Sequence, residues 1–287
     1  MRVCVDVLPP TLGRGMHRVA AALRRWAPPE IEIVSDLGAA DVQVVHVIGV
    51  GSLEHLRLDD YVLLQYCYLT TERPDASFWL PVFRRARLVM SYYDLHALTA
   101  RDDFAFHHAP LGVDGATFHD RGLGRDAVVL TTGYVLEGEA IAECHDAAFR
   151  VLRGSRGGMI HVGPAFWTHR GLEIVEGISD EQLAQRYSRS KYVSGLRRHE
   201  GFELPVVEGL ACGARPVCFD NPCYRQWFEG HAVFVPELPP DELVRVLADV
   251  FREDPAPVTA AERDAVLAAF DWRRIVGRFW ERVLEGG

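Results

Sequence analysis

Short runs of hydrophobic, often β-branched residues alternate along the chain with longer segments whose hydrophobic positions recur at helical spacing. The first run, at 2–8, is followed by a glycine-bearing loop and an amphipathic segment at 16–26, which predicts a strand, a turn and a helix. This alternation is typical of a parallel sheet covered by helices on both faces. We therefore predict an α/β fold.

The alternation occurs in two series, separated by a segment rich in Gly and Asp at 110–126. In the first series, further strands are predicted at 31–35, 42–48, 61–66, 87–92 and 104–109. In the second, strands are predicted at 127–133, 158–163, 171–177, 191–195, 215–219 and 232–236, with helices at 179–190 and 204–213. We expect two doubly wound Rossmann-like lobes, residues 1–118 and 119–287, with a terminal helix at 272–285 that packs back toward the first lobe. In such folds ligands bind at the carboxyl ends of the strands, here in a cleft between the lobes.

Composition narrows the class of protein. With 287 residues, of which 48% are hydrophobic, the chain can form one large core or two modest ones. No hydrophobic run reaches the roughly 18 residues of a membrane span, and the first residues resemble a strand rather than a signal peptide, so we expect a soluble cytoplasmic protein. The formal charge of −9 argues against a large sequence-independent surface for nucleic acid.

Neither metal binding nor two common enzyme classes are indicated. The six cysteines lie in or beside hydrophobic runs without the two-residue spacing of a zinc site, and the twelve histidines include no His-Glu-x-x-His pattern. The sequence also lacks a Gly-x-Ser-x-Gly elbow and a phosphate-binding loop that ends in Gly-Lys-Ser/Thr. We therefore predict no metal and no cofactor, and we do not favour a hydrolase or a nucleoside triphosphatase.

The segment 197–220 contains the residues that say most about function, and it reads RRHEGFELPVVEGLACGARPVCFD. Pro205 suits the first turn of a helix, because its missing N–H would be unpaired there, and Gly213 suits the left-handed residue that ends one. We therefore predict a short helix that starts near Leu204. Its free amides, with those of Gly201 and Phe202 in the preceding loop, would bind an anion, and a diphosphate is the natural ligand.

Two glutamates in this segment, Glu200 and Glu208, are candidates for binding hydroxyl groups. Glu200 lies in the loop before the predicted helix and Glu208 one turn inside it, so both could face one ligand. Carboxylates accept charge-assisted hydrogen bonds from sugar and ribose hydroxyls. The spacing alone leaves open the alternative that both glutamates are solvated surface residues.

The order of residues from Glu200 resembles family 4 retaining glycosyltransferases of the group 1 type, which have the two-lobed GT-B fold. That order is Glu, Gly, Phe, any residue, Leu, Pro, then a second Glu in a helix of small residues, Cys-Gly and Pro-Val, and EGFELPVVEGLACGARPV matches it almost throughout. The resemblance implies that Glu200 holds the donor sugar's hydroxyls near the reacting centre. It also implies that the backbone from Gly201 to Leu204 contacts sugar and phosphate, and that Glu208 binds the ribose.

Weaker similarities extend over most of the chain. The segment 41–49 looks like the family's strand that ends in His and Gly, and 109–118 is similar to the segment that closes the first lobe. The segment 179–194 resembles the helix and strand that lead to Glu200, and 270–283 resembles the family's terminal helix with Trp. These segments support the resemblance by their order and spacing.

The loop after the first predicted strand contains Gly13, Arg14 and Gly15. In the family that this chain resembles, a glycine-bearing loop at this position approaches the donor phosphate or the acceptor. Arg14 could add a cation there. Two glycines are equally consistent with a plain turn.

The resemblance fails in one place. The family usually follows the first strand of its second lobe with an Arg and then a Lys-Gly, which together neutralise the diphosphate, but 131–144 contains neither Arg nor Lys. Glu203 also stands where Gly is commoner and adds a negative side chain, although acidic residues suit a helix start. Electrostatic stabilisation of a leaving group is often worth about 3 kcal/mol or more, so another cation is expected. The candidates are Arg14, Arg170, Arg197 and Arg198.

On the acceptor side, His96 near the end of a first-lobe strand is the candidate catalytic residue, with a helix-surface histidine as the alternative. The tyrosines Tyr66, Tyr68, Tyr92 and Tyr93 also cluster near strand ends, where they could stack on an acceptor or cap the core.

The resemblance implies transfer of a hexosyl unit from a nucleoside diphosphate sugar, such as a UDP or GDP sugar, to an acceptor hydroxyl with retention of configuration. Three alternatives stay open. One is a catalytically silent GT-B protein that binds nucleotide sugar or regulates, because the Arg/Lys pair is missing. The second is a nucleotide-sugar epimerase, and the third is a glycosyltransferase whose acceptor is a protein or modified DNA rather than a small molecule.

Overall fold

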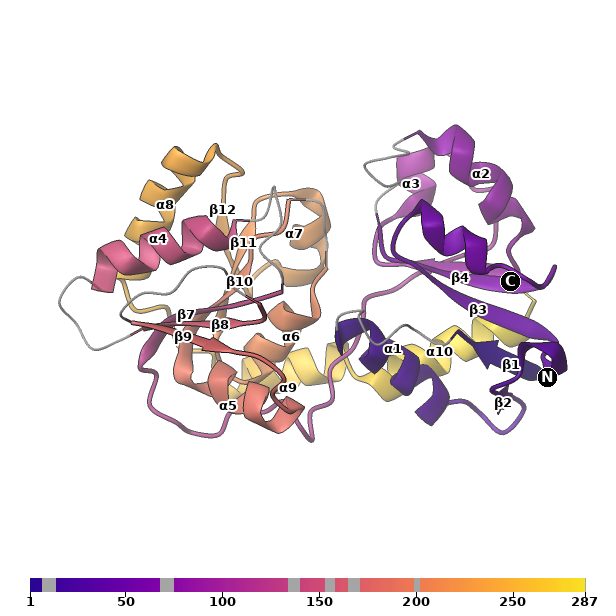
Figure 1. Ribbon diagram of the computed structural model, residues 1–287, viewed down its shortest axis with the longest axis horizontal. Helices are drawn as coiled ribbons and strands as arrows, with labels where there is room; N and C mark the ends of the chain where they lie inside the picture. Colours follow the sequence, from indigo (N-terminus) through magenta and orange to yellow (C-terminus); the bar gives the residue numbers. More distant parts are fainter. Residues whose placement is uncertain are drawn as a thin grey trace. The chain divides into compact units, whose positions relative to one another are not determined.

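The computed structural model describes residues 1–6, 14–67, 75–133, 140–152, 158–164, 171–198 and 202–286, with Arg14 described by its backbone only. Contacts divide the chain into two compact units (Figure 1). The first lobe consists of Met1–Gly112 together with Trp272–Gly287, and the second lobe is Val113–Asp271.

The first lobe is built on a parallel sheet with the strand order β2-β1-β3-β4-β5-β6. Its strands are β1 (Arg2–Val5), β2 (Glu32–Val34), β3 (Val42–Val47), β4 (Tyr61–Gln65), β5 (Leu88–Ser91) and β6 (Phe106–His108). Its helices are α1 (Arg14–Arg25), α2 (Ala76–Arg85), α3 (Leu95–Thr99) and α10 (Trp272–Leu284), with short 3₁₀ turns at Leu37–Ala39 and Val50–His55. The central strands β3 and β4 are buried along their whole length, as expected for a sheet covered on both faces.

The second lobe repeats this plan with the strand order β12-β11-β10-β7-β8-β9. Its strands are β7 (Ala127–Thr132), β8 (Gly158–Val162), β9 (Leu172–Val175), β10 (Ser190–Gly195), β11 (Arg215–Phe219) and β12 (Val233–Val235). Its helices are α4 (Ile141–Leu152), α5 (Asp180–Arg189), α6 (Leu204–Ala211), α7 (Pro222–Phe228), α8 (Pro240–Arg252) and α9 (Ala260–Ala269). The two parallel sheets with their helices confirm the predicted α/β architecture of two Rossmann-like lobes.

The terminal helix α10 is part of the first lobe. It lies beside α1, and the indole Nε1 of Trp280 donates a hydrogen bond of 3.1 Å to the carbonyl of Leu23. Trp280 and Phe279 are fully buried there. The hydrophobic face of α10 therefore completes the core of a lobe whose other residues come from the start of the chain.

The predicted boundary after residue 118 falls inside the second lobe. Val113 already bridges to Asp271, and its N–H donates to the carbonyl of Phe270 at 2.7 Å. Phe118 is buried, with its ring 6.3 Å from that of Tyr187 in α5. The chain thus enters and leaves the second lobe at neighbouring positions, which the order of residues alone does not indicate.

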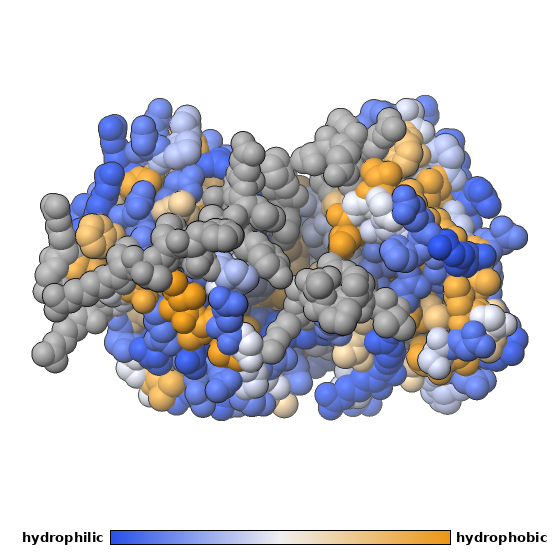
Figure 2. All heavy atoms as spheres, viewed as in Figure 1, coloured by the Kyte–Doolittle hydropathy of each residue, from blue (hydrophilic) through white to orange (hydrophobic). Residues whose placement is uncertain are grey.

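On the face shown in Figure 2, the described residues of both lobes include many polar side chains, with hydrophobic residues among them in smaller groups. Across the part of the chain that the structure describes, no helix combines the length and the hydrophobicity that crossing a membrane requires.

Gly112 generates a prediction about the start of α10. A Cβ at this position would lie 2.5 Å from Cδ2 of Trp272, whose side chain is buried. We expect Gly112→Ala to lower the free energy of unfolding by about 1–3 kcal/mol, because an overpacked site forces its neighbours to move. Urea denaturation measures the change, and Gly124→Ala is the matched control because nothing lies within 4 Å of its Cβ position. Equal stability of the two variants would contradict the prediction.

Candidate functional site

The second-lobe helix α6 begins at Leu204, as the sequence predicts, and is followed by Gly213 with a φ of 85°. Glycines bring it close to the neighbouring strand β10. A Cβ at Gly209 would lie 2.6 Å from Cγ1 of Val193, and a Cβ at Gly195 would lie 2.6 Å from Cγ2 of Val206. This close packing sets the first turn of α6 beside the carboxyl end of the strand. In that turn Pro205 has no N–H, and the N–H groups of Val206 and Val207 donate to the carbonyl of Glu203 at 3.1 and 3.4 Å, so the predicted binding of an anion by the helix-start amides stays a prediction.

Arg197 lies just beyond the end of β10, and its guanidinium reaches the end of the adjacent strand β7. Its Nη2 donates a short hydrogen bond to the carbonyl of Thr132, the last residue of β7. The next residue, Gly133, has a φ of 100°, and a Cβ there would lie 2.5 Å from Nη2 of Arg197. The positive φ favours glycine at this position.

Glu203 pairs with this arginine from the start of α6. The carboxylate Oε2 lies 3.3 Å from Nε of Arg197, and the side chains are only 4% and 11% exposed, respectively. The hydroxyl of Tyr224, a fully buried residue of α7, donates to the other carboxylate oxygen at 2.8 Å. Side chains from the segment after β10 and from α7 thus meet one buried carboxylate just before α6.

Burial raises the pKa of Glu203, while Arg197 and the hydrogen bond from Tyr224 act in the opposite direction. Burial also raises the pKa of Cys218 on β11, with a smaller contribution from the charge of Glu203. Glu203 makes no side-chain cap to the amides of α6, which differs from the capping role that its position suggested. Its carboxylate points instead to Arg197 and Tyr224.

Glu208, predicted to bind a ribose, is buried within α6. The hydroxyl of Tyr187 in α5 donates to its Oε2 at 3.3 Å. Phe202, from the predicted phosphate loop, is also buried and packs against the rings of Phe228 and Phe270, 5.3 and 5.7 Å away. Phe202 thus belongs to the hydrophobic core. The predicted roles of Glu208 and Phe202 in donor binding stay predictions.

Arg198, the neighbour of Arg197, points elsewhere. Its guanidinium donates to the carbonyl of Leu238 at 3.0 Å, pairs with Glu237 at 3.3 Å and lies 5.0 Å from the centre of the Phe219 ring. Its contacts tie the chain after β10 to the segment before α8. Of the two adjacent arginines, the structure therefore places Arg197 at the ends of β7 and β10.

Several predicted site residues lie outside the described part of the chain: Gly13, Arg170, Glu200 and Gly201, together with the side chain of Arg14. Their roles stay predictions. Gly15 is described and belongs to the first turn of α1 in the first lobe.

His96 belongs to the short helix α3 of the first lobe. Its Nε2 is 3.2 Å from the carbonyl of Phe104, and its ring packs against those of Phe104 and Phe106 at 4.7 and 4.9 Å. This environment matches the alternative of a structural histidine on a helix surface. Its predicted catalytic role stays a prediction.

The tyrosines of the first lobe that the structure describes, Tyr66, Tyr92 and Tyr93, are all buried. The hydroxyl of Tyr66 is 2.9 Å from Nδ1 of His46 in β3, and that of Tyr92 donates a short hydrogen bond to the Tyr66 carbonyl. They therefore cap the core, as one of the two alternatives predicted. Tyr68 lies outside the described residues.

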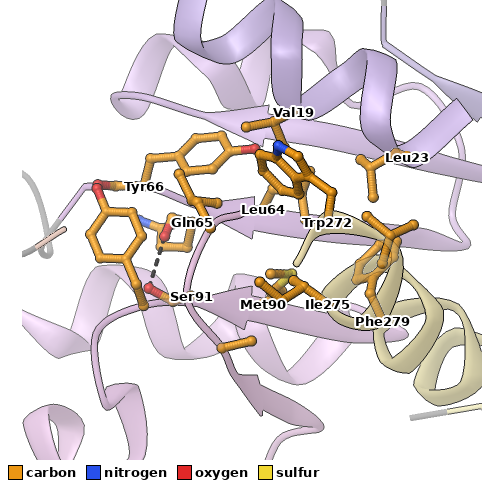
Figure 3. Close-up of a pocket in the computed structure, with 14 residues that line it drawn as sticks. Val19, Leu23, Leu64, Gln65, Tyr66, Met90, Ser91, Trp272, Ile275 and Phe279 are labelled. Atoms are coloured by element: carbon orange, nitrogen blue, oxygen red, sulfur yellow. Dashed lines mark hydrogen bonds between the residues drawn. The ribbon is translucent and has the colours of Figure 1, made fainter. Parts of the chain in front are cut away.

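A small cavity of about 10 Å³ lies in this core beneath α1 and α10, which is room for roughly one water molecule. Figure 3 shows Gln65 and Tyr66 on one side of it and Trp272 and Phe279 on the other. Its lining is almost entirely hydrophobic. Because of its size and lining, we do not assign it as a sugar site.

Sequence reasoning missed Gly133 and Tyr224 as members of the second-lobe site. Gly133 ends the predicted strand 127–133 and carries no charged group, and Tyr224 lies in a helix far along the chain. The signal available for Gly133 was a glycine directly after a buried strand, which often marks a special backbone conformation. No sequence pattern points to Tyr224.

Among the described residues, no group of three or more His, Cys, Asp or Glu side chains could hold a metal ion. The predicted independence from metals and cofactors stays a prediction.

A family model matches part of the chain. Residues 143–281 match a family described as glycosyl transferase-like, which covers most of the second lobe and much of α10. The match supports the predicted resemblance to glycosyltransferases. No match was found by sequence comparison with curated proteins.

Solved structures share the fold of the whole chain. HepE of Anabaena, in complex with UDP and glucose, has a TM-score of 0.67 and 12% identity, with 99% of both chains covered. Sucrose-phosphate synthase from Thermosynechococcus elongatus has a TM-score of 0.64 and 13% identity, covering 100% of this chain and 99% of that one. The pneumococcal O-GlcNAc transferase GtfA, in complex with UDP and GlcNAc, has a TM-score of 0.63 and 13% identity. The match covers 96% of this chain but only 60% of the GtfA chain. These likenesses confirm the GT-B fold.

The buried histidine of the first lobe generates a pH prediction. Burial lowers the pKa of His46 to about 3, whereas an unfolded histidine titrates near 6.5. Below pH 6.5 the unfolded chain takes up a proton that the folded lobe does not, so stability is complete above that pH and is lost as the pH falls toward 3.

In His46→Gln this contribution disappears. The loss of unfolding free energy between pH 7 and pH 5, measured by urea denaturation, should be smaller by about 2 kcal/mol in the variant than in the wild type. An unchanged pH dependence would show that His46 titrates normally in the folded protein.

Proposed function

We propose that this GT-B protein, whose second lobe is glycosyl transferase-like, transfers a hexosyl unit from a nucleoside diphosphate sugar to an acceptor hydroxyl with retention at the anomeric carbon. The observation that carries the proposal is the convergence of Arg197 and the first turn of α6 at the carboxyl ends of β7 and β10. In doubly wound folds this edge of the sheet is where ligands bind.

The chemistry that such a site supplies is electrostatic. The leaving diphosphate gains negative charge as the bond to the sugar breaks, and helix-start amides together with a guanidinium stabilise that charge. Arg197 is held in place by the carbonyl of Thr132, so little reorganisation accompanies the reaction. Glu200 positions the sugar hydroxyls, and Glu208 binds the ribose.

The donor binds in the second lobe. UDP is the nucleotide in the similar structures of HepE and GtfA, and we place UDP sugars first among the candidate donors, before GDP and ADP sugars. No metal takes part in this proposal, because the charge on the diphosphate is met by arginine and backbone amides.

Nucleotide binding is tested by thermal denaturation with UDP, GDP, ADP and their sugars. At a ligand concentration 100 times Kd, binding stabilises the folded state by about 2.7 kcal/mol, so one nucleotide of the panel should raise the Tm by several degrees. If none of them shifts the Tm, the donor site does not exist and the proposal fails.

Glu200→Ala tests the catalytic assignment. We expect the rate of nucleoside diphosphate release from the donor to fall at least about 100-fold while the folded structure is retained, since the sugar is no longer held in its reactive position. Glu242→Ala, an exposed position on α8, is the control and should keep the wild-type rate. A folded Glu200→Ala variant with full activity would overturn the assignment.

Nucleotide binding without turnover in the wild type would instead indicate the catalytically silent alternative.

Retention is tested separately by proton NMR of the first product formed from a donor of known anomeric configuration. The product should carry the same configuration as the donor. An inverted product would refute retention without affecting the assignment as a glycosyltransferase, and an altered sugar on the nucleotide would indicate an epimerase.

A further inference from the structure

The guanidinium of Arg197 lies at the end of β7, at the start of the segment in which the expected Arg and Lys are missing. The strand β7 is followed by a segment, 131–144, that contains no Arg or Lys. Because β7 and β10 are neighbours in the parallel sheet, a residue that follows β10 can reach the end of β7. Arg197 does so, through the hydrogen bond from its Nη2 to the carbonyl of Thr132.

Two glycines lie at this edge of the sheet, at the ends of β7 and β8. Gly133 follows β7 with a φ of 100°, and Gly163 follows β8 with a φ of 139°. A Cβ at Gly163 would lie 2.3 Å from the carbonyl oxygen of Gly133, and a Cβ at Gly133 would lie against Arg197. Among the described residues, the backbone at the ends of β7 and β8 is therefore closely packed beside the guanidinium.

The same guanidinium has a buried counterion, Glu203, which is itself held by Tyr224. A carboxylate 3.3 Å from the arginine competes with any anion for that arginine's positive charge. Removing one partner of a buried pair leaves an uncompensated charge, so removing both partners together disturbs the fold less than removing Arg197 alone.

We propose that Arg197 binds the diphosphate of the donor, in place of the cation missing after β7, and that Glu203 modulates this contact. Glu203, oriented by Tyr224, is a positioning residue that holds Arg197 at the end of β7 and lowers the affinity of Arg197 for the diphosphate. This inference rests on the proposed function. It assigns the leaving-group contact to one arginine and makes the acidic residue at position 203 a determinant of how readily the nucleoside diphosphate product dissociates.

The test compares a nucleoside diphosphate with its own nucleoside. The probe is whichever of UDP, GDP and ADP stabilises the wild type most, paired with uridine, guanosine or adenosine, and Kd is measured by isothermal titration calorimetry. The ratio of the two Kd values reports recognition of the diphosphate alone, so changes in the base and ribose sites, or in the folded fraction, cancel.

The double substitution Arg197→Gln with Glu203→Gln removes both charges and leaves no unpaired ion in the core. We expect the Kd for the nucleoside diphosphate to rise on the order of 10- to 100-fold, because a charge-assisted contact is lost, while the Kd for the nucleoside stays within about twofold. A wild-type ratio in this variant would overturn the role of Arg197.

Glu203→Gln alone should have the opposite effect. The Tyr224 hydroxyl can still donate to the amide oxygen, but the negative charge beside Arg197 is gone. We expect the nucleoside diphosphate to bind roughly 3- to 10-fold more tightly, again without change for the nucleoside. Where product release limits the rate, kcat should fall while KM also falls. Weaker or unchanged diphosphate binding would refute the role of Glu203.

The matched control is the ion pair of Arg225 and Glu229 on α7, where Arg225 also pairs with Asp220. Arg225→Gln with Glu229→Gln makes the same change of charge in the same lobe and should leave both Kd values unchanged. If the control loses as much affinity for the diphosphate as the Arg197 variant, the effect does not depend on where in the lobe the charges are removed. That result would overturn the inference. If the wild type binds no nucleoside diphosphate at all, the proposed function itself fails. If the wild type binds and the Arg197 variant has the same ratio of Kd values, only the role of Arg197 fails.

Discussion

The close packing of α6 on β10 is the constraint on which the second-lobe site depends. It is made possible by two glycines, Gly195 and Gly209, each of which faces a valine that a Cβ would meet at 2.6 Å. Because helix and strand are this close, the helix start, Arg197 and the end of β7 share one edge of the sheet. A larger residue at either glycine would move the helix and separate these groups.

Electrostatics then determine the character of the edge. The protein is acidic overall, with a formal charge of −9, yet the described part of the site centres on a guanidinium. Its counterion is Glu203, whose pKa is raised by burial, while the charge of Arg197 and the hydrogen bond from Tyr224 oppose that rise. Under the proposed function, a cation whose charge is partly balanced by a neighbouring carboxylate would hold the diphosphate during the reaction and release it afterwards.

The two lobes use the same fold for different environments. In the first, the carboxyl ends of β3 and β4 carry His46 and Tyr66, which are hydrogen-bonded to each other and buried. In the second, the corresponding edge carries a charged pair and close-packed glycines. The tyrosines near the strand ends of the first lobe thus stabilise the core, whereas the polar residues near the strand ends of the second have the chemistry of a binding site.

The sequence by itself determined the elements and the class of fold. Each predicted strand has a counterpart, and the helix from Leu204 to Ala211 lies where Pro205 and Gly213 indicated. These features are local, because hydrophobic periodicity and the conformational preferences of Pro and Gly act within a few residues of the chain. The residues from Glu200 onward likewise pointed to a glycosyltransferase through their order alone.

Only the tertiary structure decided which arginine stands at the end of β7, and with which partners. Arg197 and Arg198 are adjacent in sequence, yet one reaches Thr132 and the other reaches Leu238. Tyr224 reaches Glu203 from a helix that no short-range pattern links to it. Such pairings depend on the parallel order of strands far apart in sequence, so a pattern of neighbouring residues carries no information about them.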